Sequence, residues 1–82
     1  MTTENTQNQP EMTEEQKNIA GLAQICQERK QIFLDLRRSG ASYETLTLAA
    51  NDYADALAKW HKAKYPNKRF SKPRAGYLIR AL

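Results

Sequence analysis

The sequence is poor in the residues on which disulfide-stabilised, metal-binding and catalytic proteins depend. Its 82 residues include one cysteine, Cys26, and one histidine, His61. A lone cysteine excludes an internal disulfide framework and a metal cage built from cysteines alone. Catalytic triads and zinc sites need several such side chains to converge. We therefore expect no catalytic residue, no metal site and no cofactor, and the sequence predicts a protein that is not an enzyme.

Long apolar runs and clustered glycines are also missing. No run approaches the roughly 20 apolar residues of a membrane-spanning helix, and the polar N-terminus lacks the apolar stretch of a secretory signal. This predicts a cytoplasmic protein that does not contact a membrane. The three glycines are isolated from one another, which excludes a glycine-rich phosphate-binding loop.

Negative charge is absent from the last third of the chain. All nine acidic residues stand at or before Asp55. Residues 1–55 carry a net charge of −4, whereas residues 56–82 contain eight lysines and arginines and no acid, a net charge of +8. This asymmetry indicates a polyanionic partner for the C-terminal third.

The residues that are present predict helices. Residues 13–16 read TEEQ, a capping box in which Thr13 and Gln16 satisfy each other's backbone N–H groups. Apolar residues then recur at steps of three and four until Gly40, a natural helix stop. This pattern predicts a first helix over about residues 14–39.

A second helix is expected after Ser42, which is a suitable N-cap. Its end is predicted near Lys64, because Pro66 disfavours helical geometry at Tyr65. Its apolar stripe, also at steps of three and four, consists of Tyr43, Leu46, Ala50, Tyr53, Leu57 and Trp60.

A short third helix is expected to begin at a cap formed by Ser71 or Lys72, with Pro73 in its first turn. Leu78, Ile79 and Leu82 would hold this helix against the other two. The expected fold is all-α: residues 13–82 form one small three-helix domain of two long antiparallel helices and a short C-terminal helix. Residues 1–12 are almost wholly polar and are expected to be a disordered tail.

Residues 32–50, IFLDLRRSGASYETLTLAA, resemble the opening of helix-turn-helix-like modules in small phage and plasmid DNA-binding proteins. The shared pattern is an apolar residue, a leucine, a Gly-x-Ser-Tyr turn and an amphipathic helix, matched by Ile32, Leu36, Gly40, Ser42, Tyr43 and Leu46. The resemblance implies DNA binding, for example in transcription regulation, with a later helix in the major groove. Here the second helix is much longer than in such a module, and a basic linker replaces the tight turn. We therefore expect the linker to grip the DNA backbone.

The expected nucleic-acid-binding residues are of two kinds. Lysines and arginines neutralise phosphates, and exposed aromatic rings stack on bases or reach their edges. The set is Lys62, Lys64, Tyr65, Lys68, Arg69, Lys72, Arg74, Tyr77 and Arg80.

Duplex DNA is the favoured partner, which would make the protein nucleoid-associated. Single-stranded DNA or RNA is the alternative within the same class, because exposed rings stack on any base. The alternative from another class is a protein-interaction adaptor or inhibitor that docks on an acidic partner surface. A homodimer is a further hypothesis, because one short helix rarely reads enough DNA by itself.

A few residues admit two interpretations. Arg29 lies on the apolar face of the first helix. Either it snorkels or pairs with an acid such as Asp52 or Asp55, or it lies in a cleft or in a polar layer at a dimer seam. Leu34 and Leu48 flank the same turn and together form a candidate self-association patch. Two further assignments are structural: Cys26 is expected to be a small buried hydrophobe, and Phe70 to anchor the linker under the third helix.

Overall fold

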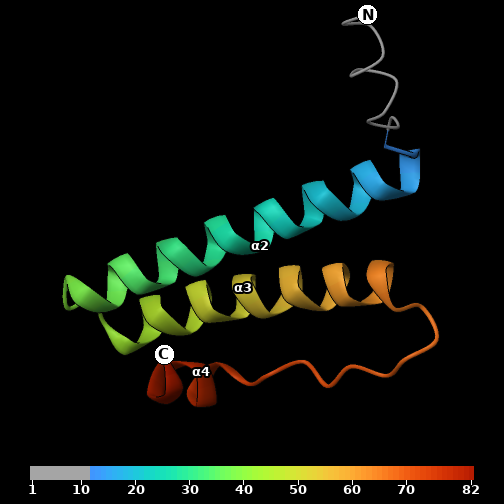
Figure 1. Ribbon diagram of the computed structural model, residues 1–82. Coiled ribbons are helices and arrows are strands. Elements are labelled where there is room, and N and C mark those ends of the chain that lie inside the picture. The colour runs from blue at the N-terminus through green and yellow to red at the C-terminus, as the bar shows by residue number, and fades with distance from the viewer. Residues whose placement is uncertain (1–11) are drawn as a thin grey trace, which may run out of the picture.

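The computed structural model describes residues 12–82, which form three helices: α2 (Glu14–Arg38), α3 (Tyr43–Lys64) and α4 (Ala75–Ala81). α2 and α3 are antiparallel, and the chain then runs back along α3 to reach α4 (Figure 1). No strand is present between residues 12 and 82. The expectation of a small all-α domain with three helices is confirmed. The expected disordered tail, apart from Met12, lies outside the described residues.

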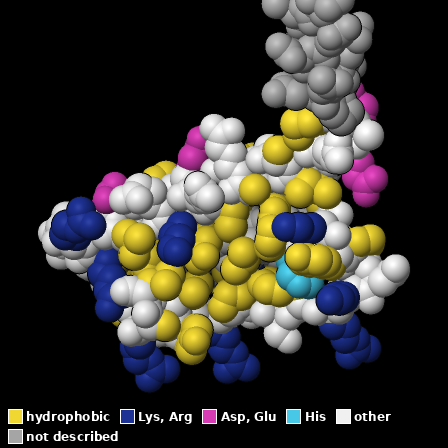
Figure 2. Space-filling view, viewed as in Figure 1, with side chains coloured by type: hydrophobic (Ala, Val, Ile, Leu, Met, Phe, Trp, Pro, Cys, Tyr) yellow, Lys and Arg dark blue, Asp and Glu magenta, His cyan; other side chains and the backbone are white. Residues whose placement is uncertain are grey.

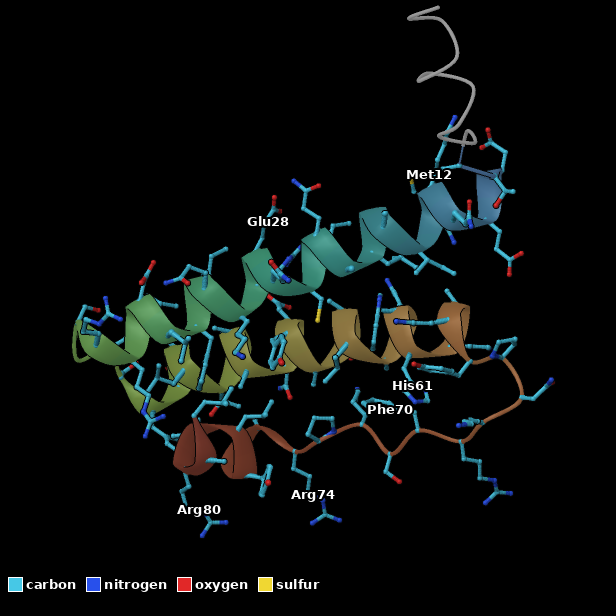
Figure 3. The ribbon with its side chains drawn as sticks, in the orientation of Figure 1. Met12, Glu28, His61, Phe70, Arg74 and Arg80 are labelled. Carbon is cyan, nitrogen blue, oxygen red and sulfur yellow. The ribbon has the colours of Figure 1, made fainter. Side chains whose placement is uncertain are left out.

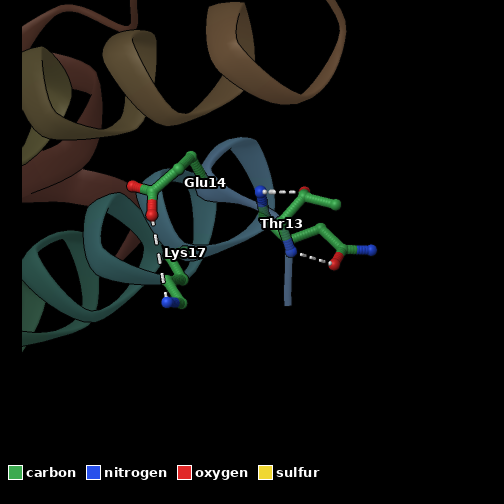
Figure 4. Close-up of polar contacts among 4 residues, drawn as sticks. Thr13, Glu14 and Lys17 are labelled. Atoms are coloured by element: carbon green, nitrogen blue, oxygen red, sulfur yellow. Dashed lines mark hydrogen bonds and ion pairs between the residues drawn. The ribbon is translucent and has the colours of Figure 1, made fainter. Parts of the chain in front are cut away.

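The capping box at the start of α2 forms as the TEEQ sequence predicts (Figure 4). The hydroxyl of Thr13 accepts a hydrogen bond of 3.1 Å from the Gln16 N–H, and the Gln16 side chain accepts one of 2.9 Å from the Thr13 N–H. Lys17 also lies 3.9 Å from the Glu14 carboxylate. The two hydrogen bonds between Thr13 and Gln16 satisfy two backbone N–H groups at the helix end that would otherwise be unpaired.

The turn between α2 and α3 depends on a glycine. Gly40 has a φ of +82°, a left-handed conformation that favours glycine. The N–H of Gly40 donates to the Arg37 carbonyl at 3.2 Å, and the N–H of Ala41 donates to the Leu36 carbonyl at 3.0 Å. These two bonds form a Schellman motif, which ends α2 and turns the chain into α3. Ser42 then caps α3, as expected.

α3 is the central element of the fold, because it packs against both α2 and α4 (Figure 1). The buried core contains one residue from α2, four from α3 and one from α4, namely Phe33, Leu46, Ala49, Ala50, Ala54 and Leu78. Ala50 and Ala54 are completely buried. Small side chains at these positions allow the neighbouring segments to approach the α3 backbone closely.

The predicted start of the third helix is wrong. Its N-cap is Arg74, which is extended and makes no side-chain capping bond, and α4 begins at Ala75. The reason is geometric: α3 has 22 residues and is about 33 Å long, and the chain must run back along it before α4 can pack. Residues 66–68 form a turn after α3, and residues 69–74 then run without regular secondary structure until Leu78 reaches the core, where it is buried.

Candidate nucleic-acid interface

Residues 65–74, which we call the strap, are attached to α3 mainly through side chains. The rings of His61 on α3 and Phe70 on the strap stack with 4.6 Å between their centroids (Figure 3). Further along, the Lys72 ammonium lies 2.7 Å from the Asp55 carboxylate. The strap has one backbone hydrogen bond within itself, from the Lys68 N–H to the Tyr65 carbonyl. These two side-chain contacts therefore fix the path of the strap along α3.

Aromatic rings and lysines gather where α3 passes into the strap. Tyr65 lies edge-on to Trp60, with 6.3 Å between the ring centroids, and 5.0 Å from the His61 ring. The Lys64 ammonium lies 5.1 Å from the Trp60 centroid, and the Lys68 ammonium lies 5.3 Å from that of Tyr65. Both distances fall in the range of cation–π attraction, which holds these two lysines over the rings.

Arginines of the C-terminal segment point away from the helix pair. Arg74 and Arg80 project from the edge of the molecule opposite Glu28, which lies on the outer side of α2 (Figure 3). On the face seen in Figure 2, basic side chains line the edge formed by the strap and α4, whereas the visible acidic side chains lie along α2. Tyr77 on α4 is 62% exposed. The strap and α4 thus carry basic side chains and no acidic ones, whereas α2 carries both.

Lys72 differs from the other seven basic residues of the segment 56–82, because it alone forms an ion pair within the described part of the chain. Its hydrogen bond and its positive charge lower the pKa of the Asp55 carboxyl. Among the expected phosphate contacts, Lys72 is therefore already engaged with an acid. The remaining expected residues lie at the end of α3 (Lys62, Lys64), on the strap (Tyr65, Lys68, Arg69, Arg74) and on α4 (Tyr77, Arg80).

His61 and Phe70 contribute to this region in a way that sequence reasoning missed. Phe70 packs on His61 near the C-terminal end of α3, and not under the third helix as expected. The Nδ1 atom of His61 is buried and has no hydrogen-bond partner among residues 12–82. The helical periodicity contains no signal for this contact, because it depends on the strap folding back along α3.

Arg29 pairs with Asp52, one of the two acids expected, and both residues line a cleft of about 300 Å³ between α2 and α3. Its guanidinium lies 3.5 Å from the Asp52 carboxylate and bridges α2 to α3. Leu34 packs against the core, whereas Leu48 is 65% exposed. These two leucines therefore do not share one exposed patch. Cys26 is buried as expected, and its burial raises the pKa of the thiol.

The described residues contain few other candidate sites. Among residues 12–82, no three His, Cys, Asp or Glu side chains are grouped so that they could hold a metal ion. None of the helices in this range has both the length and the hydrophobicity to cross a bilayer.

Comparison of the chain with protein-family models, with curated proteins and with solved structures found no match in any of the three. The assignment of an interface consequently depends on the charge and geometry of the strap and α4.

Proposed function

We propose that this protein is a small DNA-binding accessory or regulatory protein that holds the phosphate backbone against the strap and α4. The observation that carries the proposal is the unneutralised charge of residues 56–82. Seven of the eight bases in this segment form no ion pair with an acid of residues 12–82. Concentrated and unpaired positive charge along one edge is the electrostatic feature typical of nucleic-acid-binding surfaces.

The roles follow from where the side chains lie. Arg69 and Lys68 on the strap, with Arg74 and Arg80, are the phosphate contacts, and Tyr77 approaches sugars or base edges. Tyr77 and Arg80 are three residues apart on α4 and so lie near one another, and Arg74 immediately precedes the helix. With seven residues, α4 is only about 10 Å long, so backbone contacts dominate over groove reading.

The strap is suited to this role because it is ordered before any partner binds. Pro66 and Pro73 restrict its backbone, and the Phe70 stack and the Lys72 ion pair hold it on α3. Fewer conformations are then lost on binding, which favours affinity.

Salt-dependent binding to a fluorescently labelled 20-base-pair duplex tests the proposal. If about five phosphates are contacted, the logarithm of the association constant falls against the logarithm of salt concentration with a slope of about −4 to −5. The double charge reversal Lys68→Glu/Arg69→Glu should weaken binding strongly. The matched control is Lys17→Glu/Lys30→Glu on α2, which changes the net charge equally but away from the strap.

Two results would contradict the proposal. One is the absence of binding to both duplex and single-stranded DNA at about 50 mM salt. The other is an equal loss of affinity in both double variants, which would mean that net charge alone matters. A complex with an acidic protein that survives nuclease treatment, in the absence of saturable DNA binding, would support the adaptor function instead.

A further inference from the structure

A cleft of about 250 Å³ lies between the C-terminal end of α3 and residues 66–70 of the strap. Three of its residues belong to α3 and three to the strap: Ala58, His61, Lys62, Pro66, Lys68 and Phe70. His61 and Phe70 face each other between these two segments (Figure 3). The cleft is thus a product of the strap folding back on α3.

The lining of this cleft is chemically selective. Ala58, Pro66 and Phe70 provide apolar surface, and the charged residues of the lining are Lys62 and Lys68. No carboxylate lines the cleft. Apolar and aromatic walls with two cations favour a flat ring that carries an anionic group. Sites for drug-sized ligands begin at about 300 Å³, so this cleft is of a size for one ring system.

His61 contributes an aromatic surface to the same cleft. Its ring forms part of the cleft lining and stacks on Phe70 with 4.6 Å between the ring centroids. Its Nδ1 atom is buried without a hydrogen-bond partner in the described residues, so a ligand cannot reach this atom and the imidazole offers the cleft the surface of its ring.

We propose that this cleft binds an unpaired nucleotide, with its base against the Phe70 and His61 rings and its phosphate between Lys62 and Lys68. The inference rests on the proposed function and narrows the partner from DNA in general to DNA with unpaired bases. Arg69, Arg74 and Arg80 hold the backbone, and the cleft receives a base that has left the helical stack. The preferred partner is then DNA with a single-stranded end or gap, and a continuous duplex binds more weakly.

Two fluorescein-labelled probes of equal charge test the proposal: a 12-nucleotide thymidine strand and a 12-unit abasic deoxyribose-phosphate strand. Stacking of one base predicts that the abasic strand binds at least about fivefold more weakly to the unaltered protein at a fixed salt concentration. Phe70→Leu, which keeps an apolar side chain on the strap, should reduce thymidine-strand binding to the abasic level. The control is Tyr43→Leu, which removes an exposed ring outside the cleft and should preserve the difference.

Thymidine monophosphate and deoxyribose 5-phosphate provide a test that needs no variant. The nucleotide should shift the NMR signals of the His61 and Phe70 rings, whereas the sugar phosphate should leave them unchanged. Equal affinity for the two strands, or equal shifts with the two small molecules, overturns the inference while leaving the proposed function intact. Failure of both strands and of duplex DNA to bind overturns the proposed function itself.

Discussion

The ammonium of Lys72 and the carboxylate of Asp55, separated by 2.7 Å, join the strap to the middle of α3. This contact withdraws one positive charge from a segment that contains no acid of its own. Asp55 therefore holds the strap on α3 and also lowers the affinity of the strap for anions.

Replacing Asp55 with Asn should strengthen DNA binding. The change removes a negative charge near the strap and frees Lys72 for a phosphate, so the salt dependence should steepen by about one unit of slope. Asp52→Asn is the matched control, because it makes the same change of net charge but frees Arg29 on α2. Similar effects of both substitutions would contradict a specific role for Lys72.

The pKa of Asp55 should rise when Lys72 is replaced by Ala. The hydrogen bond and charge of Lys72 lower this pKa in the folded protein below its ordinary value of 3.8. A carboxyl with a depressed folded pKa stabilises the fold above its unfolded pKa, and this stabilisation is lost as the pH falls through the folded pKa. The difference in melting temperature between the wild type and Lys72→Ala should therefore be present at neutral pH, begin to shrink near pH 4, and vanish only at a pH below the folded pKa of Asp55.

Carboxyl carbon NMR shifts measured against pH report the Asp55 titration directly. An unchanged titration in the Lys72→Ala variant would show that the ion pair does not form in solution.

Phe33→Ala should unfold the protein or nearly so. Phe33 is fully buried in the core shared by the three helices, and such truncations cost about 3–5 kcal/mol. A domain of this size is typically stable by only a few kcal/mol. Leu48→Ala, at a position that is 65% exposed, should change stability by less than about 0.5 kcal/mol. Urea denaturation followed by circular dichroism measures both, and equal effects would contradict the core described above.

Replacing each of two glycines with alanine should change the stability of the fold in opposite directions. Gly40 adopts a φ of +82°, so Gly40→Ala should destabilise the fold by about 1–2 kcal/mol. Gly21 lies inside α2, where an added Cβ would meet nothing within 4 Å, so Gly21→Ala should stabilise by about 0.5–1 kcal/mol. Thermal unfolding of the two variants gives the comparison. Stabilisation by Gly40→Ala would contradict the left-handed turn.

The helices could be predicted closely where their boundaries depend on local chemistry. Thr13, Gly40, Ser42 and Pro66 determine helix ends through hydrogen bonds or steric limits within a few residues. The start of α4 could not be predicted in this way. It depends on the length of α3 and on the position of Leu78, which are properties of the whole fold.

The sequence predicts which segment forms the candidate interface. It does not predict which side chains of that segment are paired with other parts of the fold. The absence of acids after Asp55 is visible in the sequence and identifies the basic segment directly. That Lys72 is paired while Arg74 projects outward is not visible, because the partner of Lys72 lies 17 residues earlier. Similarly, the contact between Phe70 and His61 has no counterpart in the helical periodicity of either segment.

The order of the elements along the chain also bears on how the protein folds during synthesis. α2 contacts α3, and α4 contacts α3, so each new element packs on one that has already been made. The helical hairpin of α2 and α3 is complete once residue 64 has left the ribosome, before the strap follows. Such sequential contacts give a low contact order, which is typical of fast folding. The strap would then dock last, and the cleft beneath it would be the final part of the molecule to take shape.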